Sequence, residues 1–496
     1  MNKHLSAVYD RSVALAAADT DTGPQPTAAP LRQAERDARR LWRQMTLEAA
    51  ADRAQQLRRI AVPAELRAAL RLFEASTRGT DPGTASAPSA GALHPYEHLV
   101  VTGGPQEPAV FAVDPARRSC SLLHRGEHVT RALAHSALPA TGPEAFLVLT
   151  VVRPWLSMRK YGDRGYLYAQ LDAAHLAMHL LCLGSASHRR TQWLTRAAIG
   201  PMSDLLGFNE TCRLLHSVLL LEDPVPGCVP PQGDWSCTDA RGTTPRTAPT
   251  DPPEEQHWRR LAAYRPEPAG PCAPPADPRH GSLLSDVTRP GQLGGRAATG
   301  AALAVVTARR RSAKDFAAKD LPADTVREAL AALATPLTTD LSTCAGFGVT
   351  LVARRVADLA PGAYRVLAGD IAQQPSGTAP VDDQEVVRSC MGQEHLRHTA
   401  AAVVFHTARK EMFTLGLAGI DQALSRAAAL AHLLCLGATA AGAAVTTIGG
   451  FDARRWHALA AVPEGDEVLY LAMLGTAGAA QVKLDRLQRA YAHDER

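Results

Sequence analysis

One hexapeptide, His-Leu-Leu-Cys-Leu-Gly, occurs twice in this chain, at His179–Gly184 and at His432–Gly437. The two copies lie about half a chain length apart, and at a slightly different offset Val62–Glu65 matches the pattern of Leu321–Asp324. A self-match at a nearly fixed spacing indicates a duplicated structural unit. Two copies fused in one chain predict a pseudo-dimer, in which the two units pack as two identical subunits would.

The composition excludes several classes of function. With 496 residues, 46% of them hydrophobic, the chain can build two cores of ordinary size. A net charge of +4 without a concentrated basic stripe argues against a nucleic-acid partner. The longest apolar stretch, Ala427–Val445, is interrupted by His432 and Thr439, so we interpret it as a buried helix and expect no membrane association. Nine dispersed cysteines and no signal-like start predict a cytoplasmic protein.

Composition and periodicity divide the chain into four segments. Residues 1–48 are expected to form an N-terminal arm, partly disordered and then helical, and residues 49–222 a first unit. Residues 223–300 are rich in proline and poor in large apolar residues, which indicates a linker. Residues 301–496 are expected to form the second unit.

Both units show the same pattern of apolar strands around one long apolar helix. The two long helices are predicted at Leu171–Leu183 and Ala423–Leu436. The predicted strands are His98–Thr102, Val110–Val113, Phe146–Val152, Val218–Leu221, Val349–Val352, Ala401–Phe405 and Val468–Leu474. Helices that flank a mixed sheet, twice over, give an α+β fold class.

The second unit contains a basic motif and a glycine motif. Arg310–Phe316 reads Arg-Arg-Ser-Ala-Lys-Asp-Phe, so three cations and one hydroxyl fall within five residues. Such a donor set suits a phosphate dianion. Thr447–Asp452 contains Gly449 and Gly450, which let the backbone approach a flat ring closely and offer N–H donors to its edge.

The first unit contains two further motifs. Pro88–Pro95 reads Pro-Ser-Ala-Gly-Ala-Leu-His-Pro, and Lys160–Tyr166 reads Lys-Tyr-Gly-Asp-Arg-Gly-Tyr. Together the four motifs resemble those of the nitroreductase-like flavoproteins and, within them, of the SagB-type dehydrogenases. The resemblance covers most of both units, but neither the N-terminal arm nor the linker.

The resemblance implies two tandem nitroreductase-like domains that form an intrachain pseudo-dimer, with FMN as the cofactor. Members of that branch oxidise thiazolines and oxazolines in ribosomally made peptides to thiazoles and oxazoles. The implied substrate is therefore a modified precursor peptide, and the implied partner is a cyclodehydratase complex.

The resemblance also assigns roles to individual residues. The implied catalytic pair is Lys160 and Tyr161, which would take a proton while a hydride passes to flavin N5. Arg164 and Tyr166 would shape the same wall of the site. The implied cofactor-binding residues are Arg310, Arg311, Ser312, Lys314, Pro88, Ser89, Gly91, Ile448, Gly449 and Gly450.

Each unit has lost the motifs that the other retains. The first unit reads Ala51–Leu57 where the basic motif should stand, and Arg196–Ile199 where Gly-Gly-Phe-Asp should stand. The second unit lacks the Pro-Ser loop within Pro336–Gly348 and has Phe413–Leu415 in place of Lys-Tyr-Gly. Because these losses are complementary, we expect one complete site and one FMN per chain, between the units.

Two other functions stay open. The protein could be an NAD(P)H-dependent flavin reductase of nitro, enone or dehydroamino groups, or a flavin-free scaffold for peptide-modifying enzymes. Lys160 with Tyr161 favours the dehydrogenase, and the retained cations and glycines count against the scaffold. His175 and His179 stand one helical turn apart, but no third ligand is recognisable, so no metal is predicted.

Overall fold

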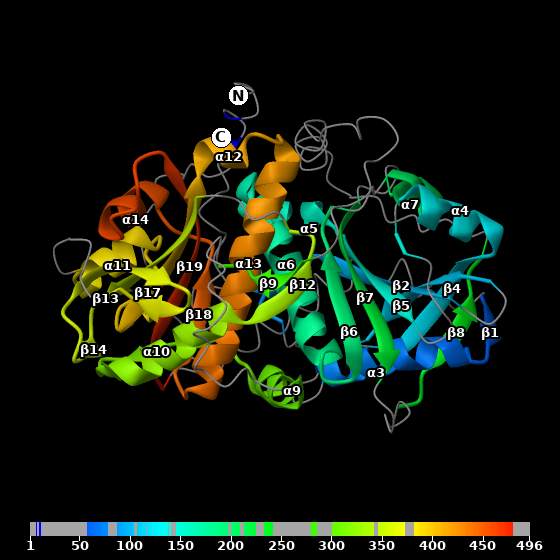
Figure 1. The fold of residues 1–496 in the computed structure, drawn as a ribbon, viewed down its shortest axis with the longest axis horizontal. Helices are drawn as coiled ribbons and strands as arrows, with labels where there is room; N and C mark the ends of the chain where they lie inside the picture. Colours follow the sequence, from blue (N-terminus) through cyan, green and yellow to red (C-terminus); the bar gives the residue numbers. More distant parts are fainter. Residues whose placement is uncertain are drawn as a thin grey trace.

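The two units lie side by side in the computed structural model, with the long helices α6 (Arg164–Gly184) and α13 (Leu417–Ala440) between their sheets (Figure 1). The structure describes residues 6, 9–10, 57–77, 87–103, 107–115, 117–136, 138–139, 145–196, 200–208, 213–224, 233–241, 279–284, 300–341, 346–372 and 381–479. Most of the predicted N-terminal arm and much of the predicted linker lie outside these residues, as does the region 51–56 of the first unit.

The first unit is built on a ten-stranded mixed sheet with the order β1-β8-β4-β3-β2-β5-β7-β6-β12-β9. Three of these strands come from later in the chain: β8 Ser236–Asp239, β9 Arg279–Ser282 and β12 Pro336–Thr339. Its central strand β5 is buried at every position, as its unbroken apolar sequence predicts. The strands within the first unit are β1 Arg58–Ile60, β2 Tyr96–Thr102, β3 Ala109–Asp114, β4 Ser119–Arg125, β5 Phe146–Val152, β6 His188–Leu194 and β7 Leu214–Pro224. The helices are η1 Ala64–Leu66, α3 Arg67–Thr77, η2 Ala90–Ala92, α4 Glu127–His135, α5 Pro154–Tyr161, α6 Arg164–Gly184 and α7 Gly200–Leu205.

The second unit is built on a seven-stranded sheet with the order β10-β19-β17-β13-β15-β16, in which β18 also pairs with β19. The strands from this part of the chain are β10 Phe316–Ala317, β11 Leu321–Pro322, β12 Pro336–Thr339, β13 Phe347–Ala353, β14 Val356–Ala357, β15 Gly362–Leu367, β16 Asp370–Ile371, β17 Ala401–Ala408, β18 Ala444–Ile448 and β19 Asp466–Ala477. The helices are α9 Gly300–Arg309, α10 Ala323–Ala331, η3 Ala332–Ala334, α11 Asp383–Ser389, η4 Glu394–Leu396, α12 Arg409–Met412, α13 Leu417–Ala440 and α14 Ala453–Leu459.

The repeated hexapeptide lies in the two central helices. Every residue of α6 is buried, and so is nearly all of α13. A helix that is apolar all round belongs in the middle of a protein or in a membrane. Helix α13 is long and apolar enough to cross a membrane, but 89% of its most apolar window is buried inside the protein, as in a core helix.

Matched backbone irregularities show the duplication in three dimensions. The pairing of β5 with β7 shifts register after Thr150, and the pairing of β17 with β19 shifts after Phe405. Gly162 ends α5 with φ 55° and ψ −143°, and Gly416 precedes α13 with φ 60° and ψ −138°. These conformations are accessible to glycine and disfavoured for other residues. Such shared details indicate that the units descend from one ancestor.

The boundary between the units is less simple than the predicted segments. Two strands, β8 Ser236–Asp239 and β9 Arg279–Ser282, fall within the predicted linker, so that segment is in part a component of the first sheet. Strand β12 comes from the second unit but pairs with β6 of the first unit and with β9. The sequence gives no sign of this exchange, because short polar strands have no distinctive periodicity.

Three described residues near the N-terminus contact the second unit. Tyr9 is buried, with its ring edge-on to Phe413 at a centroid distance of 5.5 Å. Arg409 donates to Ser6 Oγ at 2.6 Å and to Asp10 Oδ1 at 2.7 Å. This part of the predicted arm therefore packs on the second unit, and the rest of residues 1–48 lies outside the described part of the chain.

Candidate functional site

The turn Gly449–Phe451 follows β18 at the interface between the two units. Arg164, from α6 of the first unit, donates from Nη2 to the Gly449 carbonyl at 2.8 Å and to the Phe451 carbonyl at 3.2 Å. Its guanidinium also lies over the Phe451 ring, 5.2 Å from the centroid. Gln393 donates from Nε2 to the Gly450 carbonyl at 2.9 Å. The three carbonyls of the turn are therefore all held by side chains, two of them across the unit boundary.

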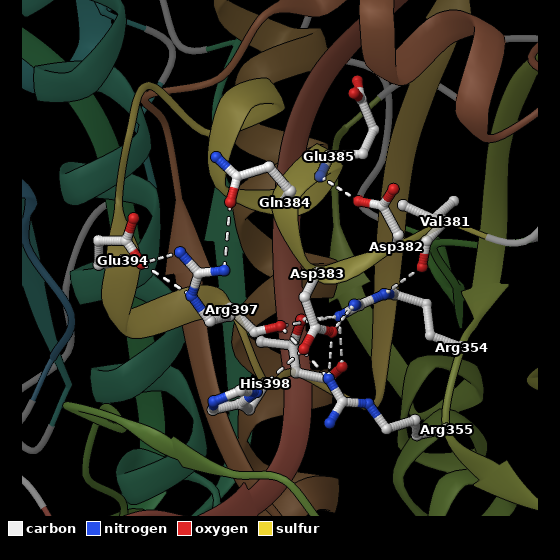
Figure 2. Close-up of polar contacts among 11 residues, drawn as sticks. Arg354, Arg355, Val381, Asp382, Asp383, Gln384, Glu385, Glu394, Arg397 and His398 are labelled. Carbon is white, nitrogen blue, oxygen red and sulfur yellow. Dashed lines mark hydrogen bonds and ion pairs between the residues drawn. The ribbon is translucent and has the colours of Figure 1, made fainter. Parts of the chain in front are cut away.

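The Arg354–Asp383 network supports the segment that carries Gln393. Arg354 is buried and donates to the carbonyls of Val381 at 2.9 Å and Thr399 at 2.6 Å, as well as to Asp383. Figure 2 shows Arg355 and His398 converging on the same carboxylate. Because this network joins both ends of residues 381–399, it fixes the loop from which Gln393 reaches the turn.

Tyr168, on α6 of the first unit, explains why Gly449 is a glycine. A Cβ atom at Gly449 would lie 2.6 Å from Tyr168 Cε1, closer than real Cβ contacts come. Tyr161 packs edge-on against Tyr168, with the ring centroids 4.9 Å apart. One aromatic ring, that of Tyr168, thus lies between the predicted catalytic Tyr161 and the predicted cofactor-binding Gly449.

The N–H groups of Gly449 and Gly450 hydrogen-bond to no acceptor among the residues that the structure describes. Ile448, which precedes them, is buried in the core of the second unit. A turn whose three carbonyls are all bonded while its two glycine N–H groups are available is suited to the acceptor-rich edge of a heteroaromatic ring. This geometry fits the predicted flavin.

The basic motif lies at the other end of β18. Ala313 N donates to the Val445 carbonyl at 2.7 Å, which places the motif beside the start of the strand. Arg310 is buried and donates from Nη1 to Ser312 Oγ at 3.2 Å, so the guanidinium and the hydroxyl lie next to each other. Gly449 lies four positions beyond Val445 in the sequence, which corresponds to about 13 Å along an extended strand. A cofactor with a phosphate at one end and a flat ring at the other matches that separation.

Arg311 and Lys314 complete the predicted phosphate donors in the sequence. Arg311 is exposed and donates from Nη1 to the carbonyls of Ala308 and Arg310, at 3.1 and 2.8 Å. Those bonds turn it back towards the end of α9. Lys314 is half-buried, two residues beyond Ser312. Arg310, Ser312 and Lys314 are therefore better placed than Arg311 to bind a phosphate.

The Pro88–Gly91 loop is held by a buried carboxylate of α6. Asp172 Oδ2 accepts from Ser89 Oγ at 2.6 Å, and Oδ1 accepts from Ala90 N at 3.0 Å. Gly91 adopts φ 59°, which glycine takes without strain. Burial raises the pKa of Asp172 to about 7, although these two hydrogen bonds act in the opposite direction. The Ser89 hydroxyl thus donates to Asp172, and its oxygen accepts from His94 N at 2.9 Å, so its predicted cofactor contact would have to use the remaining lone pair.

A buried histidine network lies between the central helices and β19. His175 Nδ1 lies 3.3 Å from His432 Nδ1, and His175 Nε2 lies 3.1 Å from the Tyr470 hydroxyl. Burial lowers the pKa values of His175 and His179 to about 3, with a further contribution from the Arg310 charge. These imidazoles are neutral at physiological pH. Within the described residues, no cluster of His, Cys, Asp and Glu is arranged to hold a metal.

The structure places the predicted catalytic pair at the end of α5. Tyr161 is buried, and its ring contacts that of Tyr168, which lies against Gly449. Lys160 precedes it in the same helix, but the position of its side chain lies outside what the structure describes. The roles of both residues stay predictions.

Sequence reasoning missed three of the positioning residues. Tyr168 and Gln393 carry no motif, and Asp172 could have been noticed only as a carboxylate within an apolar helix. Arg164 was expected to shape a wall, whereas the structure shows that it binds the glycine turn of the other unit. Its two partners are 285 and 287 residues away in sequence, beyond the reach of any local pattern.

The comparisons with known proteins identify the fold. Residues 307–476 match the model of the Nitroreductase family. A solved structure from Anabaena variabilis that is assigned as a nitroreductase covers 96% of this chain and 99% of its own, with 17% identity and a TM-score of 0.58. Similarity at this identity shows the fold alone. No curated protein matches the sequence.

Two further structures match only part of the chain. A nitroreductase assigned in Ralstonia eutropha covers 41% of this chain and 95% of its own, at 19% identity and a TM-score of 0.28. The Escherichia coli microcin synthetase complex McbBCD, with truncated pro-microcin bound, covers 34% of this chain and 70% of its own, at 17% identity and a TM-score of 0.28. Neither adds to the functional argument. The match over the whole chain confirms the predicted nitroreductase-like fold in two tandem units.

Proposed function

We propose that the protein is an FMN-dependent dehydrogenase that oxidises thiazoline or oxazoline rings of a ribosomally made peptide to thiazoles or oxazoles. The observation that supports a flavin is the turn Gly449–Phe451. Its carbonyls are held by Arg164 and Gln393, and its glycine N–H groups are available. The azoline substrate is supported by the Lys160–Tyr161 motif of the sequence.

The donor set of the second unit would hold the cofactor. Arg310 and Ser312, already paired at 3.2 Å, would bind the phosphate together with Lys314. The N–H groups of Gly449 and Gly450 would face the ring edge. Tyr168 of the first unit limits how closely this turn can approach α6, because its ring lies directly against Gly449. When bound, FMN would accept the hydride that leaves the substrate ring.

The first unit would supply the base. Loss of two hydrogens from an azoline releases a proton as well as a hydride, and Lys160 with Tyr161 would take that proton. The buried histidines are unsuited to the task, because pKa values of about 3 for His175 and His179 leave them poor bases near neutral pH. Both carboxylate oxygens of Asp172 already accept hydrogen bonds from the Pro88–Gly91 loop, one from Ser89 and one from Ala90. Lys160 and Tyr161 are therefore the groups to test.

The decisive experiment combines a visible spectrum with single-turnover assays. The purified protein should show a flavin spectrum, release one FMN per chain, and bleach when mixed anaerobically with an azoline-containing peptide. Lys160→Ala should retain the flavin and lose the bleaching, whereas Arg310→Ala should lose the flavin. Rapid bleaching by NADPH with none by azoline peptides would favour the reductase. A colourless protein that cannot be reconstituted would favour the scaffold.

A further inference from the structure

The duplication generates a second, pseudo-symmetric position for a glycine turn, at the end of β6 in the first unit. The register shift between β5 and β7 leaves His216 of β7 without a partner residue on β5. The shift between β17 and β19 leaves Leu469 of β19 without a partner residue on β17. Val218 and Leu471 therefore correspond, since each lies two residues further along its strand. Leu194 pairs with Val218, and Ile448 pairs with Leu471.

The residues that follow these strands consequently correspond as well. Thr195 occupies the position of Gly449, and Arg196 occupies the position of Gly450. This register differs by one residue from the sequence-based expectation, which placed the lost glycine motif at residues 196–199. The two turns can therefore be compared group by group.

The backbone N–H groups of the two turns have different partners. Thr195 N donates to Asp340 Oδ1 at 2.6 Å, and Arg196 N donates to Asp340 Oδ2 at 2.9 Å. The Thr195 hydroxyl adds a third bond to Oδ1 at 2.9 Å. In the other turn, Gly449 N and Gly450 N have no acceptor among the described residues. One carboxylate thus takes up both donors in the first unit.

Asp340 stands where the Pro-Ser loop of the second unit would be. Tyr96 pairs with Val152, and Phe347 pairs with Thr407, at matching places relative to the two register shifts. Counting back by the same number of residues from Tyr96 and Phe347 leads to Ser89 and Asp340. Ser89 turns its hydroxyl towards Asp172 of its own unit, whereas Asp340 reaches across to the opposite unit. Among the described residues, the loop residue Asp340 therefore bonds to the turn at Thr195 and Arg196, whereas its counterpart Ser89 bonds to Asp172 and not to the turn at Gly449 and Gly450.

A second contact closes the same region. Counting from the matched glycines Gly162 and Gly416 leads from Asp172 to Arg426, and counting from the repeated hexapeptide leads to its neighbour Ser425. Arg426 is buried and donates from Nε to the Leu283 carbonyl at 2.8 Å. Leu283 directly follows β9, which pairs with β12 just before Asp340. The residues that would line a second site therefore form hydrogen bonds with other residues of the protein, which occupy the groups that a ligand would use.

We propose that Asp340 is an internal ligand that permanently occupies the second pseudo-symmetric site and converts it into a joint between the two units. The joint consists of the Asp340 carboxylate, the N–H groups of Thr195 and Arg196, and the pairing of β12 with β6 and β9. The corollary of a single cofactor site per chain rests on the proposed flavin function. The joint itself does not, because its bonds lie within the protein.

The test measures hydrogen exchange and flavin content in Asp340→Ala and Asp340→Asn. The control is Asp382→Asn, since Asp382 also accepts a backbone N–H, from Glu385 at 2.6 Å, but within one unit. In Asp340→Ala, amide exchange in the peptide containing Thr195 and Arg196 should accelerate about tenfold or more, because both N–H groups lose a charged acceptor. Asp382→Asn should leave that peptide unchanged, and the wild-type protein should release one FMN per chain.

Unchanged exchange at Thr195 and Arg196 in Asp340→Ala would overturn the proposal, and so would two tightly bound flavins in the wild-type chain. If Asp340→Ala does not fold, Asp340→Asn provides the measurement, because it retains one acceptor oxygen and should give a smaller acceleration. No acceleration in that variant would equally refute the joint. A protein without flavin would refute the proposed function, while the exchange result would still decide the role of Asp340.

Discussion

Arg164 links the two halves of the candidate site, so its removal tests the composite geometry. Arg164→Ala deletes the bonds to the Gly449 and Phe451 carbonyls, at 2.8 and 3.2 Å, from a side chain that is 3% exposed. A hydrogen bond to a charged group contributes about 1.5–3 kcal/mol. Both bonds here use one nitrogen, so we take about 3 kcal/mol for the pair.

Losing these two hydrogen bonds should lower both the affinity for the cofactor and the stability of the fold. Without Arg164, the turn must be ordered when the ligand binds, and a penalty of about 3 kcal/mol corresponds to an FMN affinity lowered by about 100-fold. Titration of the apoprotein with FMN, followed by quenching of flavin fluorescence, measures this directly. Urea unfolding of the same apoprotein measures the general destabilisation.

Two further variants separate positioning from general damage. Arg164→Lys keeps the charge but loses the planar fork, so it should bind FMN with intermediate affinity. Arg213→Ala removes an equally buried guanidinium that binds Glu97 at 2.6 Å, within the first unit, and should lower stability without changing FMN affinity. If Arg164→Ala binds FMN as the wild type does while losing as much stability as Arg213→Ala, the turn does not depend on Arg164 and the reasoning is wrong.

Two other expectations follow from the same site. Gly449→Ala should abolish FMN binding, measured as flavin per chain, because its Cβ would lie 2.6 Å from Tyr168; partial recovery in a double variant with Tyr168→Ala would support that cause, and normal binding by the single variant would exclude it. Burial raises the pKa of Asp172 from 3.8 to about 7, so the native protein retains a proton that the unfolded chain releases between those values. Stability from Asp172 should therefore rise as the pH falls from about 7 towards 4, and urea midpoints of Asp172→Asn should lack this slope.

The sequence was informative wherever a long apolar pattern dominated. The predicted helices Leu171–Leu183 and Ala423–Leu436 lie within α6 and α13, which extend further at both ends. The extensions include Arg164 and Asp421, polar residues that a hydrophobic pattern would place outside a buried helix. Partners on the other unit explain their presence, because Arg164 binds the glycine turn and Asp421 accepts from Tyr166.

Short strands escaped prediction for a different reason. Strands β8 and β9 read Ser-Cys-Thr-Asp and Arg-His-Gly-Ser, with no alternation of apolar and polar residues. They are strands because β4 and β12 present edges to which a passing segment can bond. In the candidate site, the motifs indicated which residues are involved, but the bonds that position them connect segments far apart in the chain. Those bonds depend on how the two units pack.

The exchanged strand β12 has a consequence for how the molecule is made. During translation, all residues of the first unit through β7 leave the ribosome well before Pro336–Thr339. Until then β6 is paired with β7 on one side only, and its other edge is unpaired; such edges are the places where nascent chains associate wrongly. The first half of this protein therefore cannot complete its own sheet, and expressing it alone should yield a chain prone to aggregate.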